Sequence, residues 1–207
     1  MVGGIVMNNA SGMCCGTHAN SYRALKSVRI ILPDGTLLDT GDEKNRAAFV
    51  MSHQKFIRKI EELRDKTRKN ARLMERIRRK YSIKNVTGLN LLPFVEFDDP
   101  FEIIAHSIVG SEGTLAFLSE ITVNTAHLYP HSASAMLYFS DLEEACKAVV
   151  AMKKGPVAGA ELLDKKSLSA VNDPTGEGLT AVLTETKADS PEELQKNINE
   201  ILEILKG

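Results

Sequence analysis

Apolar side chains recur at helical spacing between residues 42 and 81. The apolar positions are Phe49, Phe56, Ile60 and Leu63 in a first series, with gaps of seven, four and three, and Leu73, Ile77 and Tyr81 in a second, with gaps of four. Residues with these spacings share one face of a helix, so each series predicts a helix that buries one apolar stripe. We expect two helices, broken near Lys69–Asn70.

The N-terminal part of the chain lacks this period. Residues 2–17, which include GGIVMNNASGMCCGT, are small, glycine-rich and polar, and they predict an irregular loop around short extended pieces. A β-hairpin follows. Residues 28–32 are rich in β-forming side chains, the PDGT sequence at 33–36 is typical of a turn, and residues 37–38 resume the strand.

Two further local signals follow the helical block. Asp98 and Asp99 precede Pro100, where a carboxylate can cap the amides of a helix over residues 101–107. The glycine-rich sequence GSEGT at residues 110–114 predicts a loop, with β-prone residues on both sides.

The pattern changes after Pro130. It predicts strands over 134–139, 157–163 and 180–186, and helices over 141–153, 165–171 and 191–205, the last with Ser190 as its N-cap. This β-α-β-β-α order with a short extra helix lacks only a last strand of a ferredoxin-like sandwich. We therefore predict an α+β fold with an antiparallel sheet in each of two parts, divided near residues 127–132.

Composition excludes several classes of protein. Hydrophobic residues make up 43% of the 207 residues and charged residues 26%, which is typical of globular proteins. The sequence shows no apolar run near the roughly 18 residues that span a bilayer and no secretion signal. Its three cysteines form neither a disulfide framework nor a zinc spacing. We expect a protein of the cytoplasm, or one peripheral to the inner face of the membrane, without a transmembrane segment.

Positive charge is concentrated in one block. Residues 55–84 hold thirteen Lys and Arg against four Asp and Glu, although the net charge of the chain is −1. Such a block can meet nucleic acid, an acidic protein surface or membrane headgroups. The interspersed acids and the lack of interleaved aromatic residues favour solvated helices over nucleic-acid binding. A non-catalytic interaction module that binds an anionic partner through residues 55–84 is the alternative function.

Two segments contain more glycine and small polar residues than packing requires. The first is NNASG at residues 8–12, followed by Gly16 and Thr17, and the second is GSEGT at 110–114. Asn and Ser supply neutral donors and acceptors, Gly lets a flat ligand approach the backbone, and successive amides of the second segment can form an anion-binding nest. Neither matches the phosphate-loop or dinucleotide fingerprint, and each alone is also consistent with a tight turn.

Other chemistry is less well supported by the sequence. Cys14 or Cys15 near His18 lacks a third, orienting group for nucleophilic catalysis. His127 and His131 have the spacing of metal ligands on a helix, but a proline lies between them and no third ligand is evident. We assign no catalytic and no metal-binding residue.

Longer stretches of the sequence resemble a known family. NNASGMCCGT, the region up to LLDTGD, RRKYSIKN, GSEGTLAFLSEIT and AELLDKKSL are similar to the FAD-linked oxidases, also called vanillyl-alcohol-oxidase-like flavoproteins. These include glycolate oxidase subunits, D-lactate dehydrogenases and D-2-hydroxyglutarate dehydrogenases. The long helical insert most resembles large bacterial members that join a flavin module to an iron–sulfur module.

The resemblance implies a fold and a cofactor. Residues 1–128 would be the second FAD-binding subdomain, with a basic helical insertion at about 42–107, and residues 129–207 the start of an incomplete ferredoxin-like substrate cap. The family oxidises a 2-hydroxy acid to a 2-oxo acid by hydride transfer to FAD. The residues implied to contact FAD are Asn8, Asn9, Ala10, Ser11, Gly12, Gly16 and Thr17, and Gly110, Ser111, Glu112, Gly113, Thr114 and Leu115.

The resemblance also implies partners. The family's pyrophosphate-binding subdomain and the rest of its cap have no counterpart in these residues, so we expect a fragment of a larger enzyme that is inactive alone. Its partners would be the first FAD-binding subdomain, the rest of the cap, a small 2-hydroxy acid and an iron–sulfur module of the parent protein. We expect no nucleic-acid partner.

Overall fold

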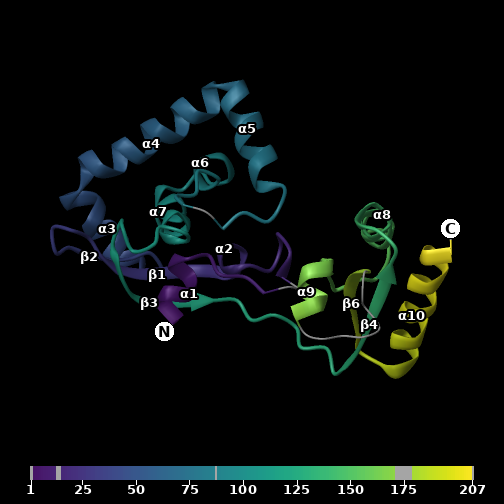
Figure 1. Cartoon of the computed structure of the whole chain (residues 1–207). Coiled ribbons are helices and arrows are strands. Elements are labelled where there is room, and N and C mark those ends of the chain that lie inside the picture. Colours follow the sequence, from purple (N-terminus) through teal and green to yellow (C-terminus); the bar gives the residue numbers. More distant parts are fainter. Residues whose placement is uncertain (1, 13–14, 87, 171–178, 207) are drawn as a thin grey trace. The chain divides into compact units, whose positions relative to one another are not determined.

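The chain forms two compact units, which are described separately. The computed structural model describes residues 2–12, 15–86, 88–170 and 179–206 (Figure 1). The units are Met1–Ala126 (unit 1) and His127–Gly207 (unit 2). Each contains a three-stranded antiparallel sheet together with helices, and the predicted α+β class is therefore confirmed.

The sheet of unit 1 is built on the predicted hairpin. Strand β1 (Leu25–Ile31) lies between β2 (Leu37–Asp39) and β3 (Phe117–Val123). Gly35 turns the hairpin with φ +84°, a backbone conformation that side chains with a Cβ rarely adopt. Ile30 pairs with Leu38 across it, and both side chains are fully buried. The PDGT turn is thus confirmed.

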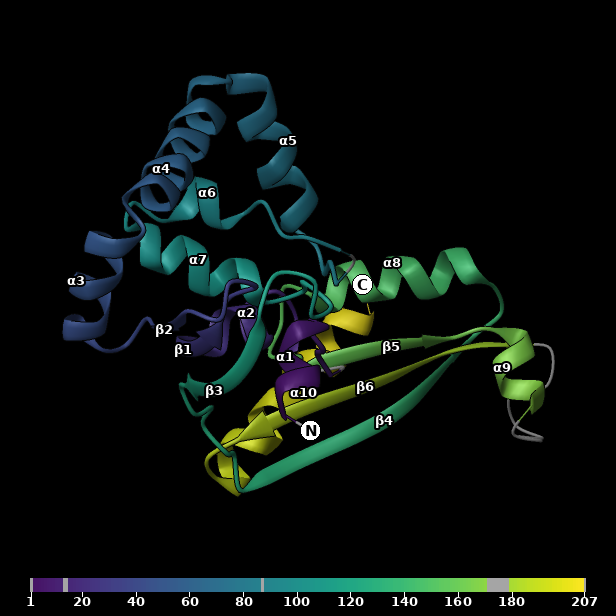
Figure 2. The same ribbon diagram turned by 90° about the vertical axis from the view of Figure 1, so that its left-hand side faces the viewer.

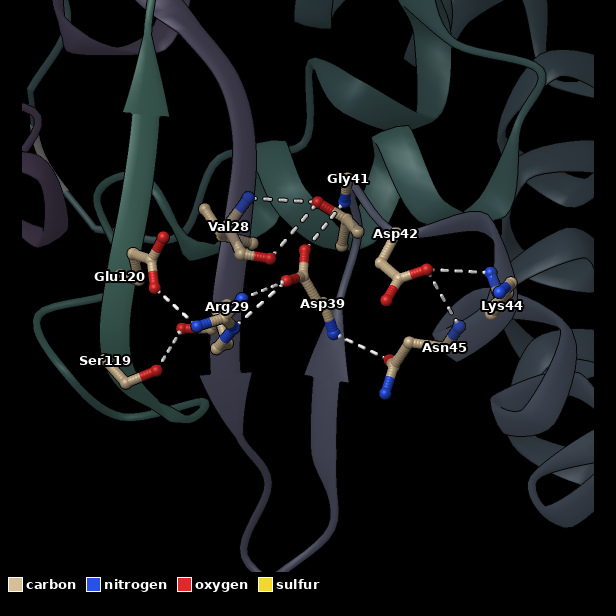
Figure 3. Close-up of polar contacts among 10 residues, drawn as sticks. Val28, Arg29, Asp39, Gly41, Asp42, Lys44, Asn45, Ser119 and Glu120 are labelled. Carbon is tan, nitrogen blue, oxygen red and sulfur yellow. Dashed lines mark hydrogen bonds and ion pairs between the residues drawn. The ribbon is translucent and has the colours of Figure 1, made fainter.

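Arg29 in the central strand links all three strands of this sheet (Figure 3). Its guanidinium pairs with Asp39 on β2 (Nη2–Oδ2 2.8 Å) and with Glu120 on β3 (Nη1–Oε2 2.5 Å). The backbone N–H of Asp39 in turn donates to Asn45 Oδ1 (2.8 Å), which ties the first helix of the insertion to β2. Polar contacts on the sheet therefore fix the position at which the helical block begins.

The N-terminal residues form a short helix, and the expectation of an irregular loop is wrong there. Helix α1 (Val2–Met7) buries Val6 in the core of unit 1, and α2 (Ser21–Ala24) leads into β1. A six-residue helix with two glycines has too little length for a visible period and little intrinsic propensity. Its helicity therefore depends on tertiary packing, which the local sequence does not reveal.

The helical block contains three long helices where the sequence predicts two. These are α3 (Glu43–Ser52), α4 (Gln54–Lys69) and α5 (Ala71–Tyr81). The break at Asn70 is confirmed, since its side-chain oxygen caps α5 by accepting from Leu73 N (3.0 Å). A second break lies at His53, whose backbone (φ −123°, ψ 36°) leaves the helical region. The apolar spacing runs through His53 unchanged, and the break is therefore invisible in the period.

The predicted apolar stripes are only partly buried. Phe49, Ile57 and Ile77 belong to the core of unit 1, whereas Phe56 and Leu63 remain 39% and 41% exposed. Ile57 thus occupies the inward position that the spacing assigns to Phe56. The second stripe is confirmed at Ile77.

Helices α6 (Pro93–Glu96) and α7 (Pro100–Ile108) lie between the sheet and the α4–α5 pair (Figures 1 and 2). Asp99 caps α7 as expected, accepting from Phe101 N (2.9 Å). Residue 108 ends this helix, so the segment before the 110–114 loop is helical, and the prediction of β structure on that side is wrong. Six of the nine α7 residues are buried, and burial on nearly all faces removes the usual amphipathic signal.

Unit 2 has the predicted element order. It consists of β4 (His131–Phe139), α8 (Leu142–Met152), β5 (Gly159–Leu163), α9 (Lys165–Ala170), β6 (Thr180–Ala188) and α10 (Pro191–Lys206). Figure 2 shows the three strands side by side in the order β4–β6–β5. Ala145, Met152, Val182 and Ile201 form the core beneath α8 and α10. Among the described residues, no helix combines the length and apolar character needed to cross a membrane.

Candidate functional site

The two glycine-rich segments lie against each other in unit 1. We call residues 8–17 the first wall and residues 110–115 the second wall. Gly110 N donates to Val6 O (3.3 Å) and Glu112 N donates to Met7 O (3.0 Å). With its amide nitrogen turned toward the carboxylate, Asn8 donates to Glu112 Oε2 at 2.6 Å. The first wall begins at the end of α1, and there it is in direct contact with the second wall.

Both walls contain backbone in the left-handed region. Asn9 (φ +48°) and Glu112 (φ +53°) are the only residues other than glycine with positive φ in the described part of the chain. Gly16, Gly110 and Gly113 also have positive φ. Such conformations cost free energy at residues with a Cβ, and they cluster at functional sites. Their concentration in the two walls supports a binding role for this region.

Close packing explains one of these glycines. A Cβ on Gly110 would lie 3.2 Å from the backbone oxygen of Gly88 and 3.7 Å from the Asn9 side chain. The oxygen belongs to the main chain and cannot rotate away. Position 110 therefore requires glycine for both its φ of +83° and the space around it.

Asn9 is a positioning residue in this structure. Its side chain is buried, with Oδ1 accepting from Tyr22 N (3.2 Å) and Nδ2 donating to Asn85 O (3.4 Å). These bonds hold the first wall between α2 and the segment that follows α5. The amide groups are thus engaged with the protein backbone.

Lys84 also braces the first wall, a role that the sequence did not reveal. Its ammonium donates to Ser11 O (3.2 Å) and Gly12 O (3.5 Å). In the sequence this lysine is one of thirteen basic residues of a block, with nothing to separate it from the others. Only the tertiary fold brings it back to the N-terminal segment.

Each wall contains one buried hydroxyl without a hydrogen-bond partner among the described residues. These are Ser11 Oγ and Ser111 Oγ. An unsatisfied buried hydroxyl costs about 1–3 kcal/mol, so native structures rarely keep one without a reason. A second hydroxyl in the same loop is satisfied, since Thr114 Oγ1 donates to Ser111 O (2.6 Å). Each wall thus holds a hydroxyl whose hydrogen-bonding capacity the described residues do not use.

The remaining predicted contact residues lie in different surroundings. Ala10 O accepts from Ser21 Oγ (2.9 Å), and Thr17 lines a small polar pocket together with Tyr22. Leu115 instead lines an apolar cavity of about 520 Å³ between the hairpin turn, α4 and α7. Residues 13 and 14, including Cys14 of the cysteine–histidine hypothesis, lie outside the described residues.

A polar cluster around the buried Tyr22 supports the base of the first wall. Tyr22 OH donates to Glu96 Oε2 (2.9 Å), and the Arg23 guanidinium binds both oxygens of the same carboxylate (2.9 and 2.7 Å). Burial, and secondarily the Glu96 charge, raises the pKa of Tyr22 far above its ordinary value. His106 packs edge-on to Tyr22, and burial lowers the pKa of its imidazole. Phenol and imidazole are therefore both neutral, structural groups.

Neighbouring carboxylates have separate structural partners. Asp99 pairs with Arg46 besides capping α7, and Asp98 pairs with Arg68. The bond to the Arg68 guanidinium lowers the pKa of Asp98. Together with Glu96, these acids are each engaged elsewhere and form no acid–base pair.

The histidines considered as metal ligands are not gathered into a site. His127 Nε2 lies 2.6 Å from Asp189 Oδ1 on the surface of unit 2. Within the described ranges, no three His, Cys, Asp or Glu side chains are grouped so that they could hold a metal ion. Cys15 and Cys146 are free thiols.

Comparison with known families now identifies the class of protein. Residues 1–41 match the FAD binding domain, and residues 128–207 match the C-terminal domain of FAD linked oxidases. Both matches are to domains of FAD-linked oxidases, and the resemblance in the sequence is confirmed. The first wall lies inside the first match, whereas the second wall lies outside both.

Two curated relatives give the comparison more detail. The chain is 37% identical over 83 residues to the mitochondrial D-lactate dehydrogenase (cytochrome) of Arabidopsis thaliana, an alignment that covers 39% of this chain and 15% of that protein. It is 24% identical over 201 residues to the D-2-hydroxyglutarate dehydrogenase of Haemophilus influenzae, covering 91% of this chain and 19% of the relative. The chain thus spans less than a fifth of the length of either relative.

Proposed function

We propose that the chain forms one side of the FAD site of a dehydrogenase that oxidises a D-2-hydroxy acid, of the D-lactate or D-2-hydroxyglutarate type, to the 2-oxo acid. The names of the two relatives support this substrate class. The contact between the two walls, each with an unpartnered buried hydroxyl, is the observation that carries the proposal.

The residues of the walls fit a flavin. Ser11 Oγ and Ser111 Oγ are donors without an acceptor, and the edge of the isoalloxazine ring presents carbonyl oxygens and ring nitrogens that accept. Gly12 leaves the backbone of the first wall accessible to a flat ring, since only Cys15 Sγ lies within 4 Å of where its Cβ would be. The charge of Lys84 close to the first wall also favours a cofactor that carries phosphates.

Bound FAD supplies the hydride acceptor of the reaction, and the walls bind and orient it. Gly110 and Asn9 fix the relative position of the walls, and the Tyr22–Glu96–Arg23 cluster holds the first wall from below. We assign none of these residues a proton-transfer role. The base that takes the substrate hydroxyl proton would belong to another part of the parent protein.

We further propose that the chain works within a larger protein that carries the other FAD-binding subdomain, the rest of the cap and an iron–sulfur module. Loss of the pyrophosphate-binding half would remove several hydrogen bonds to charged oxygens, each worth about 1.5–3 kcal/mol. The isolated chain should therefore bind FAD weakly and have no dehydrogenase activity. Fluorescence titration of the isolated chain with FAD would measure this.

The direct test uses the complete gene product. We expect it to purify with flavin absorbance, which D-lactate or D-2-hydroxyglutarate bleaches without oxygen and the L-enantiomers do not. A Ser11→Ala/Ser111→Ala double variant should retain less flavin, while Ser119→Ala, which removes an exposed hydroxyl that already has a partner in Arg29 O, should retain it all. A product that neither contains nor takes up FAD would refute the proposal.

A further inference from the structure

Ten of the thirteen basic residues of 55–84 fall into two groups with different surroundings. Arg64, Arg68 and Lys84 serve the fold: Arg68, for example, donates to the backbone oxygens of Phe94, Val95 and Phe97. The other group lies on the last turn of α4 and along α5, and Figure 1 shows this helix pair on the side of unit 1 away from the sheet. We call it the basic corner, and its members are Lys66, Lys69, Arg72, Arg76, Arg78, Arg79 and Lys80.

All seven side chains of the basic corner are exposed, and none forms an ion pair with any described residue. Lys80 lies over the ring of Tyr81 (5.8 Å) and has no carboxylate partner. Residues 66–82 contain a single acid, Glu75. By contrast, the earlier part of α4 pairs Lys59 with Glu62 and Arg64 with Asp65. The corner is thus a local excess of charge that the protein does not neutralise.

This excess opposes the stability of the helix that carries it. Arg72 and Arg76 are four residues apart on α5, as are Arg76 and Lys80, and like charges at this spacing repel. The inner face of α5 already anchors the helix, because Ile77 is buried and Leu73 and Tyr81 pack against the core. The outer arginines therefore contribute nothing to folding that the apolar stripe does not supply.

A groove with a mixed lining runs through the basic corner. It has a volume of about 590 Å³ and lies between the end of α4 and α5. Three arginines line it together with the apolar residues Ala71 and Met74, one acid and one serine; the arginines are Arg68, Arg78 and Arg79, and the other two are Glu75 and Ser82. Arginine binds carboxylates with two parallel hydrogen bonds, and methionine adapts its shape to apolar side chains.

We propose that the basic corner is a docking surface for an acidic polypeptide segment that also carries apolar side chains. Four of its seven cations are arginines, which suit carboxylates, and the groove can take an aliphatic side chain between them. Nucleic acid fits less well, since Tyr81, the only aromatic residue of 66–82, packs inward and leaves no stacking platform. A membrane fits less well too, because the apolar stripe of α5 faces the core. The proposal does not rest on the FAD site.

The test measures binding of a fluorescent peptide of four Glu-Glu-Leu-Glu repeats to the whole chain at low and moderate salt. Arg72→Glu/Arg76→Glu/Arg79→Glu should weaken binding about tenfold or more. Lys44→Glu/Lys55→Glu/Arg58→Glu makes the same change in net charge at exposed positions elsewhere in the helical block, and it should weaken binding less than about threefold. Equal losses in the two variants would overturn the proposal.

Three further measurements separate the alternatives. A peptide of Glu-Glu-Gly-Glu repeats should bind more weakly than the leucine peptide. Equal affinity would show that the basic corner binds anions without recognising apolar side chains, which would contradict the proposal. Single-stranded RNA of the same charge should also bind more weakly, and tighter binding would assign the surface to nucleic acid. The variant Arg72→Gln/Arg76→Gln/Arg79→Gln removes repulsion between like charges, so its melting temperature should be no lower than that of the wild type. Its affinity for the leucine peptide should nevertheless be lower. Retained binding in this stable variant would refute the docking surface.

Discussion

The backbone amide of Glu112 donates to the carbonyl oxygen of Met7 at 3.0 Å, although the two residues lie near opposite ends of the sequence of unit 1. This bond joins the end of α1 to the loop after α7 and brings the two glycine-rich walls together. A substitution that displaces one wall is therefore expected to displace the other wall as well.

Gly110→Ala should destabilise unit 1 severely. A residue with a Cβ at φ +83° costs about 1–2 kcal/mol, and crowding against the fixed oxygen of Gly88 adds about 1–3 kcal/mol. Gly35→Ala is the matched control, since it has nearly the same φ but no atom within 4 Å of the added Cβ. Urea unfolding of both variants measures the difference, and equal losses would show that the contact with Gly88 has no energetic consequence.

Ser111→Ala should have opposite effects on the isolated chain and on the flavin-loaded parent protein. In the isolated chain it removes an unsatisfied buried hydroxyl, so the unfolding free energy should stay unchanged or rise by up to about 1 kcal/mol. In the loaded protein it should weaken flavin retention by about tenfold, as expected for one hydrogen bond. Thermal melting and flavin content are the readouts. A clear loss of stability in the isolated chain would mean that Ser111 has an internal partner.

Arg68→Ala should destabilise unit 1 by about 2–3 kcal/mol, because it removes hydrogen bonds to several carbonyl oxygens and the pair with Asp98. Arg68→Lys should not restore the loss, since a lysine cannot reproduce the planar fork. Arg72→Ala, on the exposed face of the next helix, should change stability by less than about 0.5 kcal/mol. Urea unfolding compares the three, and similar values for Arg68→Ala and Arg72→Ala would contradict the structural role of Arg68.

The stability of unit 1 should decrease in mild acid because of His106. Burial lowers the pKa of this imidazole below its ordinary value of 6.5, so the unfolded chain takes up a proton before the folded chain does. The unfolding free energy should therefore fall as the pH decreases below about 6.5, until the folded pKa is passed. His106→Phe should lack this loss while keeping the aromatic contacts.

The wild-type protein and the His106→Phe variant should both still lose stability near pH 4 and below. Hydrogen bonds from Thr36 and Arg68 lower the pKa values of Asp34 and Asp98 respectively, so protonation of these carboxyls disfavours the folded state. The unfolding free energy, measured across the pH range, separates the loss of stability due to His106 from the loss near pH 4 due to the carboxyls. An unchanged slope above pH 5 in His106→Phe would exclude His106 as its cause.

Elements with local chemical signals were predictable from the sequence. The Pro33–Thr36 turn, the Asp99 cap and the Asp141 and Ser190 caps of unit 2 each depend on side chains next to the backbone that they bond. Helix α1 and the break at His53 were not predictable, because burial of Val6 and an irregular backbone at one residue leave no periodic trace.

The candidate site was also only partly predictable from the sequence. Residue types and glycines alone selected the two wall sequences, and the resemblance to a flavoprotein family linked them. Their contact, the bracing by Lys84 and the two unsatisfied serines depend on segments far apart in the chain. The residue-by-residue assignment of FAD contacts stays a prediction.

The pairing of β1 with β3, which begins at Ile31 and Phe117, has a consequence for the segment between β2 and β3. The chain leaves the sheet after β2 and returns to it at β3, so both ends of the helical excursion are clamped by the same three strands. Loop closure is then already achieved by the sheet, and the free energy of the excursion depends only weakly on its length. Changes in length are therefore expected to be tolerated best near Asn70, where α4 meets α5, and least near Lys84 and Gly88, which contact the two walls.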